Sequence, residues 1–178
     1  MRAFKKSKVN LSDAPKETMR WPSKRMKDGP VGALQGTVKS VDIVIVKISD
    51  DEKKEVLLGR LDERWSDNGK YEWGVAGREI LGKENWKKTV FRNVADELGC
   101  EVVMCKKFCE NENNALGNHY MGIGVLAEIS GEPKVLTPQD WNEWRWFSID
   151  DIPKKLFPAA KKVIDAYLNS VGRSTSLE

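Results

Sequence analysis

The pattern of hydrophobic and polar positions changes at residue 37. Residues 1–36 carry prolines, glycines and many charges with little periodicity, which indicates an arm with few fixed elements. From Val38 to Ile48 β-branched residues dominate, and this run predicts a strand. A polar turn follows, after which Glu55–Arg60 is expected to form the returning strand.

The strongest helical periodicity predicts a helix over Glu84–Leu98. Its apolar side chains recur every four residues, at Trp86, Val90, Val94 and Leu98. Phe91 is expected to widen this stripe, and Gly99 follows where a left-handed cap is favoured. A second helix is predicted from Pro158 to Asn169, with proline in its first turn.

The remaining apolar runs predict strands at Tyr71–Val75, Val102–Phe108, His119–Ile129 and Trp144–Phe147. The segment Cys109–Asn118 holds two Glu and four Asn and is predicted to be a loop. Strands on both sides of a central helix, with a C-terminal helix after them, indicate a mixed α/β sandwich.

The size and charge of the chain fit one domain with an extension. The chain has 178 residues and 40% hydrophobic residues, which suffices for one core. It holds no apolar run of membrane-spanning length and its basic N-terminus lacks an apolar signal core, so we expect a cytoplasmic protein without a membrane partner. Residues 1–35 carry nine Lys or Arg and three Asp or Glu, a balance of +6, whereas the remainder carries −3. The arm is therefore either a solvated extension or a contact for a polyanion such as nucleic acid.

The cysteines do not predict a structural metal site. Cys100, Cys105 and Cys109 are an odd number and lack paired CxxC spacing, and the only histidine is His119. We interpret Cys100 and Cys105 as small apolar fillers.

Three polar residues of the predicted helix could carry chemistry. Asn93, Asp96 and Glu97 lie three and four positions apart and are expected on one side of the helix. Carboxylates at a loop-bounded helix can bind a hard divalent cation such as Mg²⁺. A solvated acidic face is the alternative, and the longer pattern around the helix favours the cation site.

That longer pattern resembles the signature of the Nudix family, G-x5-E-x7-R-E-U-x-E-E-x-G-U, where U is aliphatic. The match extends from Gly77 to Cys100 without an insertion. Four positions keep the residue type of the family: Glu84, Arg92, Glu97 and Gly99. Three positions differ: Arg78 replaces Gly, Asn93 replaces Glu and Asp96 replaces Glu. If the family's Gly is needed for a positive φ, Arg78 is strained there by about 1–2 kcal/mol.

Flanking segments extend the resemblance to residues 38–169. Trp73–Arg78 resembles the W-x-[LF]-P-G-G that precedes the box, and Val56–Arg60 resembles the strand ending in Gly-Arg. Glu143–Phe147 resembles the family's E-W-x-W stretch. The resemblance implies an α/β/α sandwich with a mixed central β-sheet over residues 37–170, between the arm 1–36 and a polar tail 171–178 of the kind that an expression vector adds.

The resemblance also implies a set of site residues. A Mg²⁺ or Mn²⁺ ion would be held by Glu97, Asp96 and the carbonyl of Arg78, with Asn93 in the same shell, and Arg92 would orient the carboxylates through a salt bridge. Asn93 cannot act as a general base, so we expect the base from outside the helix. The candidates are Glu112, which we assign to the catalytic set, and Glu110, Asp140 and Glu143.

The implied substrate is a nucleoside diphosphate linked to a group X. The E-W-x-W similarity favours a nucleoside triphosphate or a nucleotide sugar, by analogy only. Arg60, at a strand end, is expected to bind phosphate, and His119 is the second expected substrate contact. The chain is thus predicted to be a Mg²⁺-dependent pyrophosphohydrolase, and the alternative is a related domain that binds a nucleotide or a partner without turnover. A homodimer is left open.

Overall fold

Strand β1 (Thr37–Ile48) lies at the centre of the computed structural model, which describes residues 37–49, 51–115 and 118–172, with only the backbone at 115 and 118. Its middle, Ser40–Ile45, is buried, as expected for a β-branched run covered on both faces. The predicted arm and residues 173–178 of the predicted tail lie outside the described residues.

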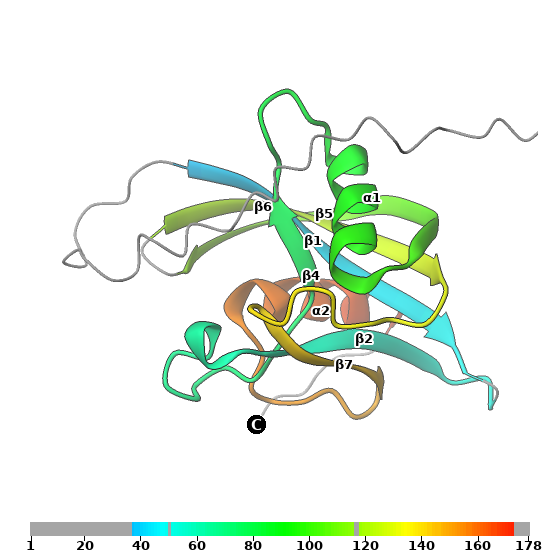
Figure 1. Cartoon of the computed structure of the whole chain (residues 1–178). Coiled ribbons are helices and arrows are strands. Elements are labelled where there is room, and N and C mark those ends of the chain that lie inside the picture. The colour runs from blue at the N-terminus through cyan, green and yellow to red at the C-terminus, as the bar shows by residue number, and fades with distance from the viewer. Residues whose placement is uncertain (1–36, 50, 116–117, 173–178) are drawn as a thin grey trace, which may run out of the picture. The chain divides into compact units, whose positions relative to one another are not determined.

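One half of the sheet is built around the parallel pair β1 and β6. Strand β6 (Asn118–Ser130) runs parallel to β1, and β5 (Glu101–Ala115) pairs antiparallel with β6. Strand β4 (Ala76–Glu79) pairs antiparallel with the first half of β1. Figure 1 shows these strands beside one another. The mixed sheet that was predicted is therefore present.

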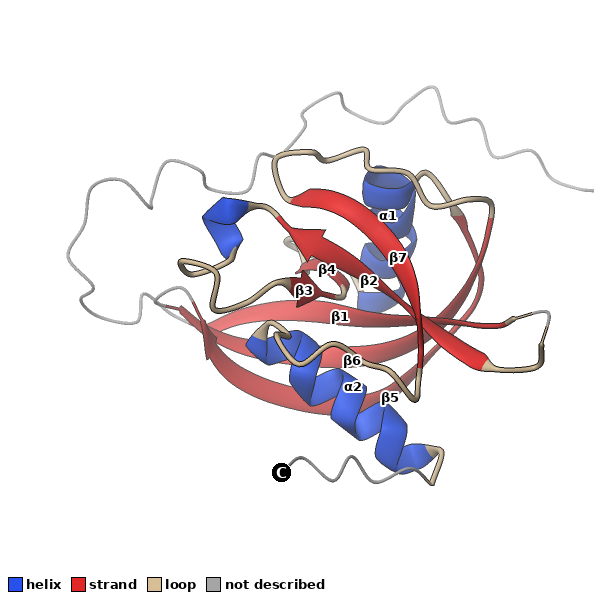
Figure 2. Ribbon diagram, turned by 90° about the horizontal axis from the view of Figure 1, so that it is seen from below, coloured by secondary structure: helices blue, strands red, loops and turns tan. Residues whose placement is uncertain are grey.

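The other half of the sheet is antiparallel. The last residues of β1 pair with β2 (Lys54–Leu61), which also pairs with β3 (Trp73–Gly74) and with β7 (Trp141–Ser148). A short 3-10 helix, η2 (Glu63–Trp65), follows β2. The two halves diverge along β1, as the view in Figure 2 shows.

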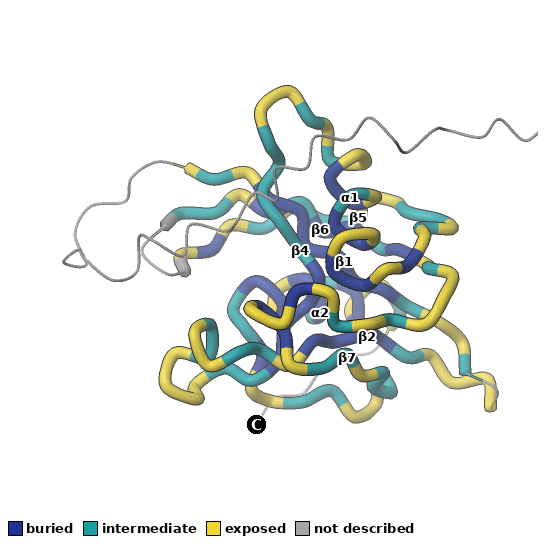
Figure 3. Tube along the Cα trace, in the orientation of Figure 1, coloured by how far each residue is buried: buried dark blue, intermediate teal, exposed yellow. Residues whose placement is uncertain are grey.

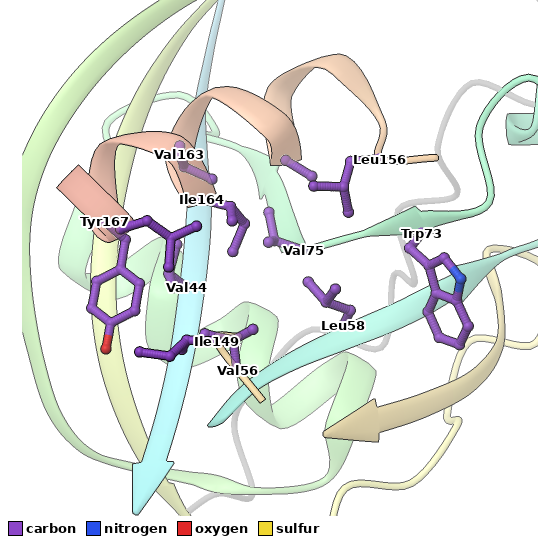
Figure 4. Packing of buried hydrophobic residues seen from close by; sticks show 12 residues of the cluster. Val44, Val56, Leu58, Trp73, Val75, Ile149, Leu156, Val163, Ile164 and Tyr167 are labelled. Atoms are coloured by element: carbon purple, nitrogen blue, oxygen red, sulfur yellow. The ribbon is translucent and has the colours of Figure 1, made fainter. Parts of the chain in front are cut away.

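Two helices cover opposite sides of β1. Side chains of a strand point alternately to its two faces, so Val41, Ile43 and Ile45 pack with α1 (Trp86–Leu98), whereas Val44 packs with α2 (Pro158–Ser170). The buried residues of α2, among them Val163, Ile164 and Tyr167, meet β2 and β3 residues in the cluster of Figure 4. This arrangement is the predicted α/β/α sandwich.

Helix α1 begins and ends at well-formed caps. The Asn85 side chain accepts a hydrogen bond from the backbone N–H of Lys88, so the helix starts two residues after the predicted Glu84. Gly99 ends it with φ 67°, in the left-handed conformation predicted for that position. Within the described residues no helix is long and apolar enough to span a membrane.

Two predictions about local structure were wrong. Residues 109–115, predicted to be loop, continue strand β5, because each of their ladder positions has a partner on β6. Phe91, predicted to widen the apolar stripe, is 51% exposed, because the core lies on the side of Val90 and Val94. Figure 3 shows this division of α1 into a buried and an exposed side. The three cysteines are free, and Cys100 is buried in the core as predicted.

Candidate active site

The segment from β4 to α1 places the box against β1. Gly77 lies opposite Asp42 in the ladder, and a Cβ at Gly77 would meet the carbonyl oxygen of Val41 at 2.6 Å. Only glycine permits this close approach of the two strands. Arg78 follows in β4, and its φ is not positive, so the strain that was considered for this position is absent.

Glu84 and Arg92 join the loop to the helix. Arg92 donates through Nε to Glu84 Oε1 at 3.1 Å and through Nη2 to Glu84 Oε2 at 2.8 Å. Thr89 Oγ1 adds a hydrogen bond of 2.9 Å, and Arg92 also donates to the carbonyl of Glu79. The hydrogen bonds from Arg92 lower the pKa of Glu84 to about 2. Arg92 therefore orients one box carboxylate, Glu84, and is not paired with Asp96, the other partner that the spacing allows.

Glu97 is the buried carboxylate of the site. Its side chain is 2% exposed, and Oε1 accepts a hydrogen bond of 3.0 Å from Nε of Arg78, whose side chain is 14% exposed. Burial raises the pKa of Glu97 to about 7, although the charge and the hydrogen bond of Arg78 lower it. The second oxygen, Oε2, is buried without a hydrogen-bond partner among the described residues. Arg78 and the Asn93 amide are thus the hydrogen-bond donors that lower the pKa of the carboxylate against the larger effect of burial.

The other two predicted metal ligands on α1, Asn93 and Asp96, differ in burial. Asn93 lies one turn before Glu97 and is fully buried; its amide hydrogen-bonds to Glu97 and so lowers the pKa of that carboxylate against the larger effect of burial, while its Oδ1 has no hydrogen-bond partner among the described residues. Asp96 is exposed. The structure therefore brings the guanidinium of Arg78, rather than the predicted carbonyl, and the side chain of Asn93 to Glu97, and it leaves Asp96 at the surface.

These side chains do not fit a divalent cation as they stand. A hard cation needs several oxygen ligands, and here it would meet one buried carboxylate that already holds a guanidinium and one neutral amide. Among residues 37–49, 51–115 and 118–172 no group of three His, Cys, Asp or Glu is arranged to hold a metal ion. The site as it stands therefore supports no catalytic step through a metal.

Asp140 is a second buried acid next to this pair. Backbone hydrogen bonds attach the loop after β6 to the end of α1, from Leu136 N–H to the Glu97 carbonyl and from Lys134 N–H to the Leu98 carbonyl. Asp140 on this loop accepts a hydrogen bond of 3.1 Å from Trp65 Nε1. Burial raises its pKa and Arg78 lowers it, while the Asp140 charge raises the pKa of Glu97. Of the four candidate bases, Asp140 is the one buried beside Glu97.

The remaining predicted site residues lie elsewhere on the surface. Arg60 forms ion pairs with Glu72 at 3.5 Å and with Glu143 at 3.9 Å. His119 interacts with Asn114 at 3.1 Å across the β5–β6 ladder. Glu112 is exposed on β5. The structure does not place these three residues in contact with the Arg78–Glu97 pair.

Glu112 instead borders a separate hollow of about 340 Å³. Its lining comes from β1, β5 and β6, namely Lys39, Glu110, Asn111, Glu112, Met121, Gly122 and Ile123. None of these residues belongs to the box. The hollow therefore gives no support to Glu112 as the base that serves Glu97.

Comparisons with known proteins agree with this architecture. A model of the NUDIX domain matches residues 38–167. The structure is similar to the MutT NUDIX hydrolase from Burkholderia pseudomallei, with a TM-score of 0.64 and 26% identity over 74% of this chain and 98% of that one.

Two more distant structures share the fold. One is the NUDIX domain of Shewanella oneidensis NrtR, complexed with ADP ribose, with a TM-score of 0.61 and 17% identity over 78% of this chain and 90% of that one. The other is a C. elegans Ap4A hydrolase, with a TM-score of 0.60 and 14% identity over 76% of this chain and 98% of that one. The predicted resemblance and fold class are confirmed.

Proposed function

The chain belongs to the Nudix family, and we propose that it hydrolyses the pyrophosphate bond of a nucleoside diphosphate linked to a group X. A nucleoside triphosphate or a nucleotide sugar is the favoured substrate. The observation that carries the proposal is the placement of Glu97, which the box framework buries beside Asp140 and Arg78. Relatives named as hydrolases of the MutT and Ap4A types support the reaction class.

Each residue of the site has a role that its position supports. The Glu84–Arg92 pair fixes the loop onto α1 and so holds β4 at the site. The guanidinium of Arg78 is the cationic group available to phosphate oxygens. Asp140 is our candidate to accept the proton of the attacking water, in place of Glu112, because it lies in the same buried group as Glu97.

A divalent cation, Mg²⁺ or Mn²⁺, would neutralise charge on the pyrophosphate oxygens. For Glu97 to serve such an ion, Arg78 must first release it, because its oxygen Oε1 is taken by the guanidinium.

A second candidate function is nucleotide binding without turnover. The specific observation in its favour is that Arg78 neutralises the buried Glu97 while Asn93 contributes no charge. Such a site would hold a pyrophosphate and lack the carboxylates that metal-assisted hydrolysis requires.

One experiment separates the two. The chain is incubated with dNTPs, nucleotide sugars, dinucleoside polyphosphates and ADP-ribose in Mg²⁺, in Mn²⁺ and in EDTA. Release of product and thermal stabilisation are both recorded. Turnover of a panel member supports hydrolysis, and stabilisation without product supports the second function. No turnover and no stabilisation by any nucleotide would contradict both.

A further inference from the structure

We infer that Arg78 is a built-in competitor of a divalent cation for the Glu97 carboxylate, so that cation binding at the box requires displacement of this side chain. The inference rests on the proposed role of Glu97 and adds a regulatory feature to the same site. It starts from the position of Arg78, where the family signature has glycine and this chain has a long cation.

The geometry shows that the guanidinium already occupies the carboxylate. Arg78 Nε lies 3.0 Å from Glu97 Oε1, and the two side chains are 14% and 2% exposed. At this depth a counter-charge stabilises the charged form of the carboxylate, because desolvation disfavours an unpaired ion. Arg78 supplies that counter-charge from within the chain. A divalent ion at the same oxygen would repel the guanidinium, so the two are alternative occupants.

A further atom indicates that the pair is an incomplete site. Asn93 Oδ1 is a buried acceptor for which the described residues provide no donor, and beyond Arg78 the donor that acts on Glu97 is the amide of Asn93 itself. A buried acceptor without a hydrogen bond destabilises the fold, and such atoms are uncommon in folded proteins unless a ligand or ion binds there. Asn93 Oδ1 and the carboxylate oxygens of Glu97 are hard oxygen atoms on adjacent turns of α1, which is the ligand type that Mg²⁺ and Mn²⁺ prefer. These acceptors therefore favour a divalent cation as an alternative occupant of the position that the Arg78 guanidinium now holds.

A purely structural ion pair is the competing explanation. In that case Arg78 would hold β4 to α1, and its removal would loosen the strand. However, β4 is already fixed by its ladder with β1, over Ser40–Ile43 and Ala76–Glu79, and by the Glu84–Arg92 pair. Removal of Arg78 should therefore leave β4 in place. The two explanations differ in cation binding, because a purely structural ion pair predicts no gain of cation binding when Arg78 is removed.

The test is Mn²⁺ binding to the full chain without nucleotide, measured by the EPR signal of free Mn²⁺. Arg78→Ala is expected to bind one Mn²⁺ at least about tenfold more tightly than the wild type, because one unit of nearby positive charge is lost. Mn²⁺ is also expected to raise the unfolding temperature of this variant more than that of the wild type. Arg78→Gln, which keeps a hydrogen-bond donor without the charge, should behave in the same way if Arg78→Ala does not fold.

Two controls define the site. Lys161→Ala removes one positive charge on the other side of the sheet, where Lys161 pairs with Asp165, and should leave the affinity unchanged. Arg78→Ala combined with Glu97→Gln should abolish the gain. Equal Mn²⁺ affinity in Arg78→Ala, Arg78→Gln and the wild type would overturn the inference, as would a gain that survives Glu97→Gln. Absence of nucleotide turnover alongside gained Mn²⁺ binding would count against the proposed hydrolysis alone.

Discussion

The two ion pairs of the box, Glu84–Arg92 and Glu97–Arg78, differ in how completely their carboxylates are satisfied. Both oxygens of Glu84 accept hydrogen bonds, from Arg92 and Thr89, and its pKa is lowered to about 2. Glu97 has one bonded oxygen, and burial raises its pKa to about 7. The first pair has the properties of a structural clamp, whereas beside the second pair the buried acceptor Asn93 Oδ1 has no donor among the described residues.

The largest expected effect is on turnover. Glu97→Gln keeps the size of the side chain and removes its charge, so we expect hydrolysis of any accepted nucleotide to fall at least about 100-fold. Product release is measured with Mg²⁺ and Mn²⁺, and circular dichroism checks that the variant is folded. Turnover equal to the wild type would remove Glu97 from the active site and would erase the contrast between the two pairs.

The clamp should matter mainly for stability. Arg92→Ala leaves Glu84 partly buried without its partner, and we expect the free energy of unfolding to fall by about 3–5 kcal/mol. Urea denaturation measures the change. A loss below about 1 kcal/mol would mean that the Glu84–Arg92 pair does not hold the loop.

Asp42 is another buried carboxylate, and it differs from Glu84 and Glu97 in its partner. Among the described residues it accepts a hydrogen bond from the amide of Asn111 and forms no ion pair. Burial raises its pKa to about 6, although the hydrogen bond of 3.1 Å from Asn111 lowers it. Because the folded pKa lies above the unfolded one, this group favours the folded state below about pH 4 and loses that contribution as the pH rises through 6.

Replacement of this acid should flatten the pH profile. Asp42→Asn is expected to remove a change in unfolding free energy of about 2–3 kcal/mol between pH 4 and pH 7. Urea titrations of both proteins across that range measure it. A wild-type profile with the same slope as that of the variant would show that Asp42 does not titrate in this way.

An exposed pair should contribute least. Lys161 and Asp165 are one helical turn apart on α2, at 2.9 Å, with side chains that are 45% and 35% exposed. Lys161→Ala is expected to change the unfolding free energy by less than about 0.5 kcal/mol. A larger loss in the same urea assay would mean that the contribution of an ion pair to the stability of this protein does not depend on how deeply the pair is buried.

Local pattern was sufficient to predict the framework of the site. The spacing of Val90, Val94 and Leu98 predicted the buried side of α1, and Gly99 predicted its end, because both follow from helix geometry. The polar residues 109–115 misled the strand prediction, because pairing with β6 overrides their low strand propensity.

The chemistry of the site depends on tertiary contacts that spacing does not contain. Arg78 and Glu97 are 19 residues apart and meet only because β4 lies beside α1. The three-and-four spacing put Asp96 on the same side as Asn93 and Glu97, yet a rotation of about 100° per residue leaves Asp96 exposed while Glu97 is buried. Asp140 was one of four candidate bases, and only its burial beside Glu97 distinguishes it.

The competition between Arg78 and a cation can be observed most directly by crystallography. Crystals of the wild type and of Arg78→Ala would be soaked in the same Mn²⁺ concentration and compared by anomalous scattering. The account predicts a Mn²⁺ peak beside the Glu97 carboxylate and Asn93 in the variant, and a much weaker one in the wild type, where the guanidinium remains on Oε1. Peaks of equal height in both crystals, or no peak at Glu97 in the variant, would contradict it.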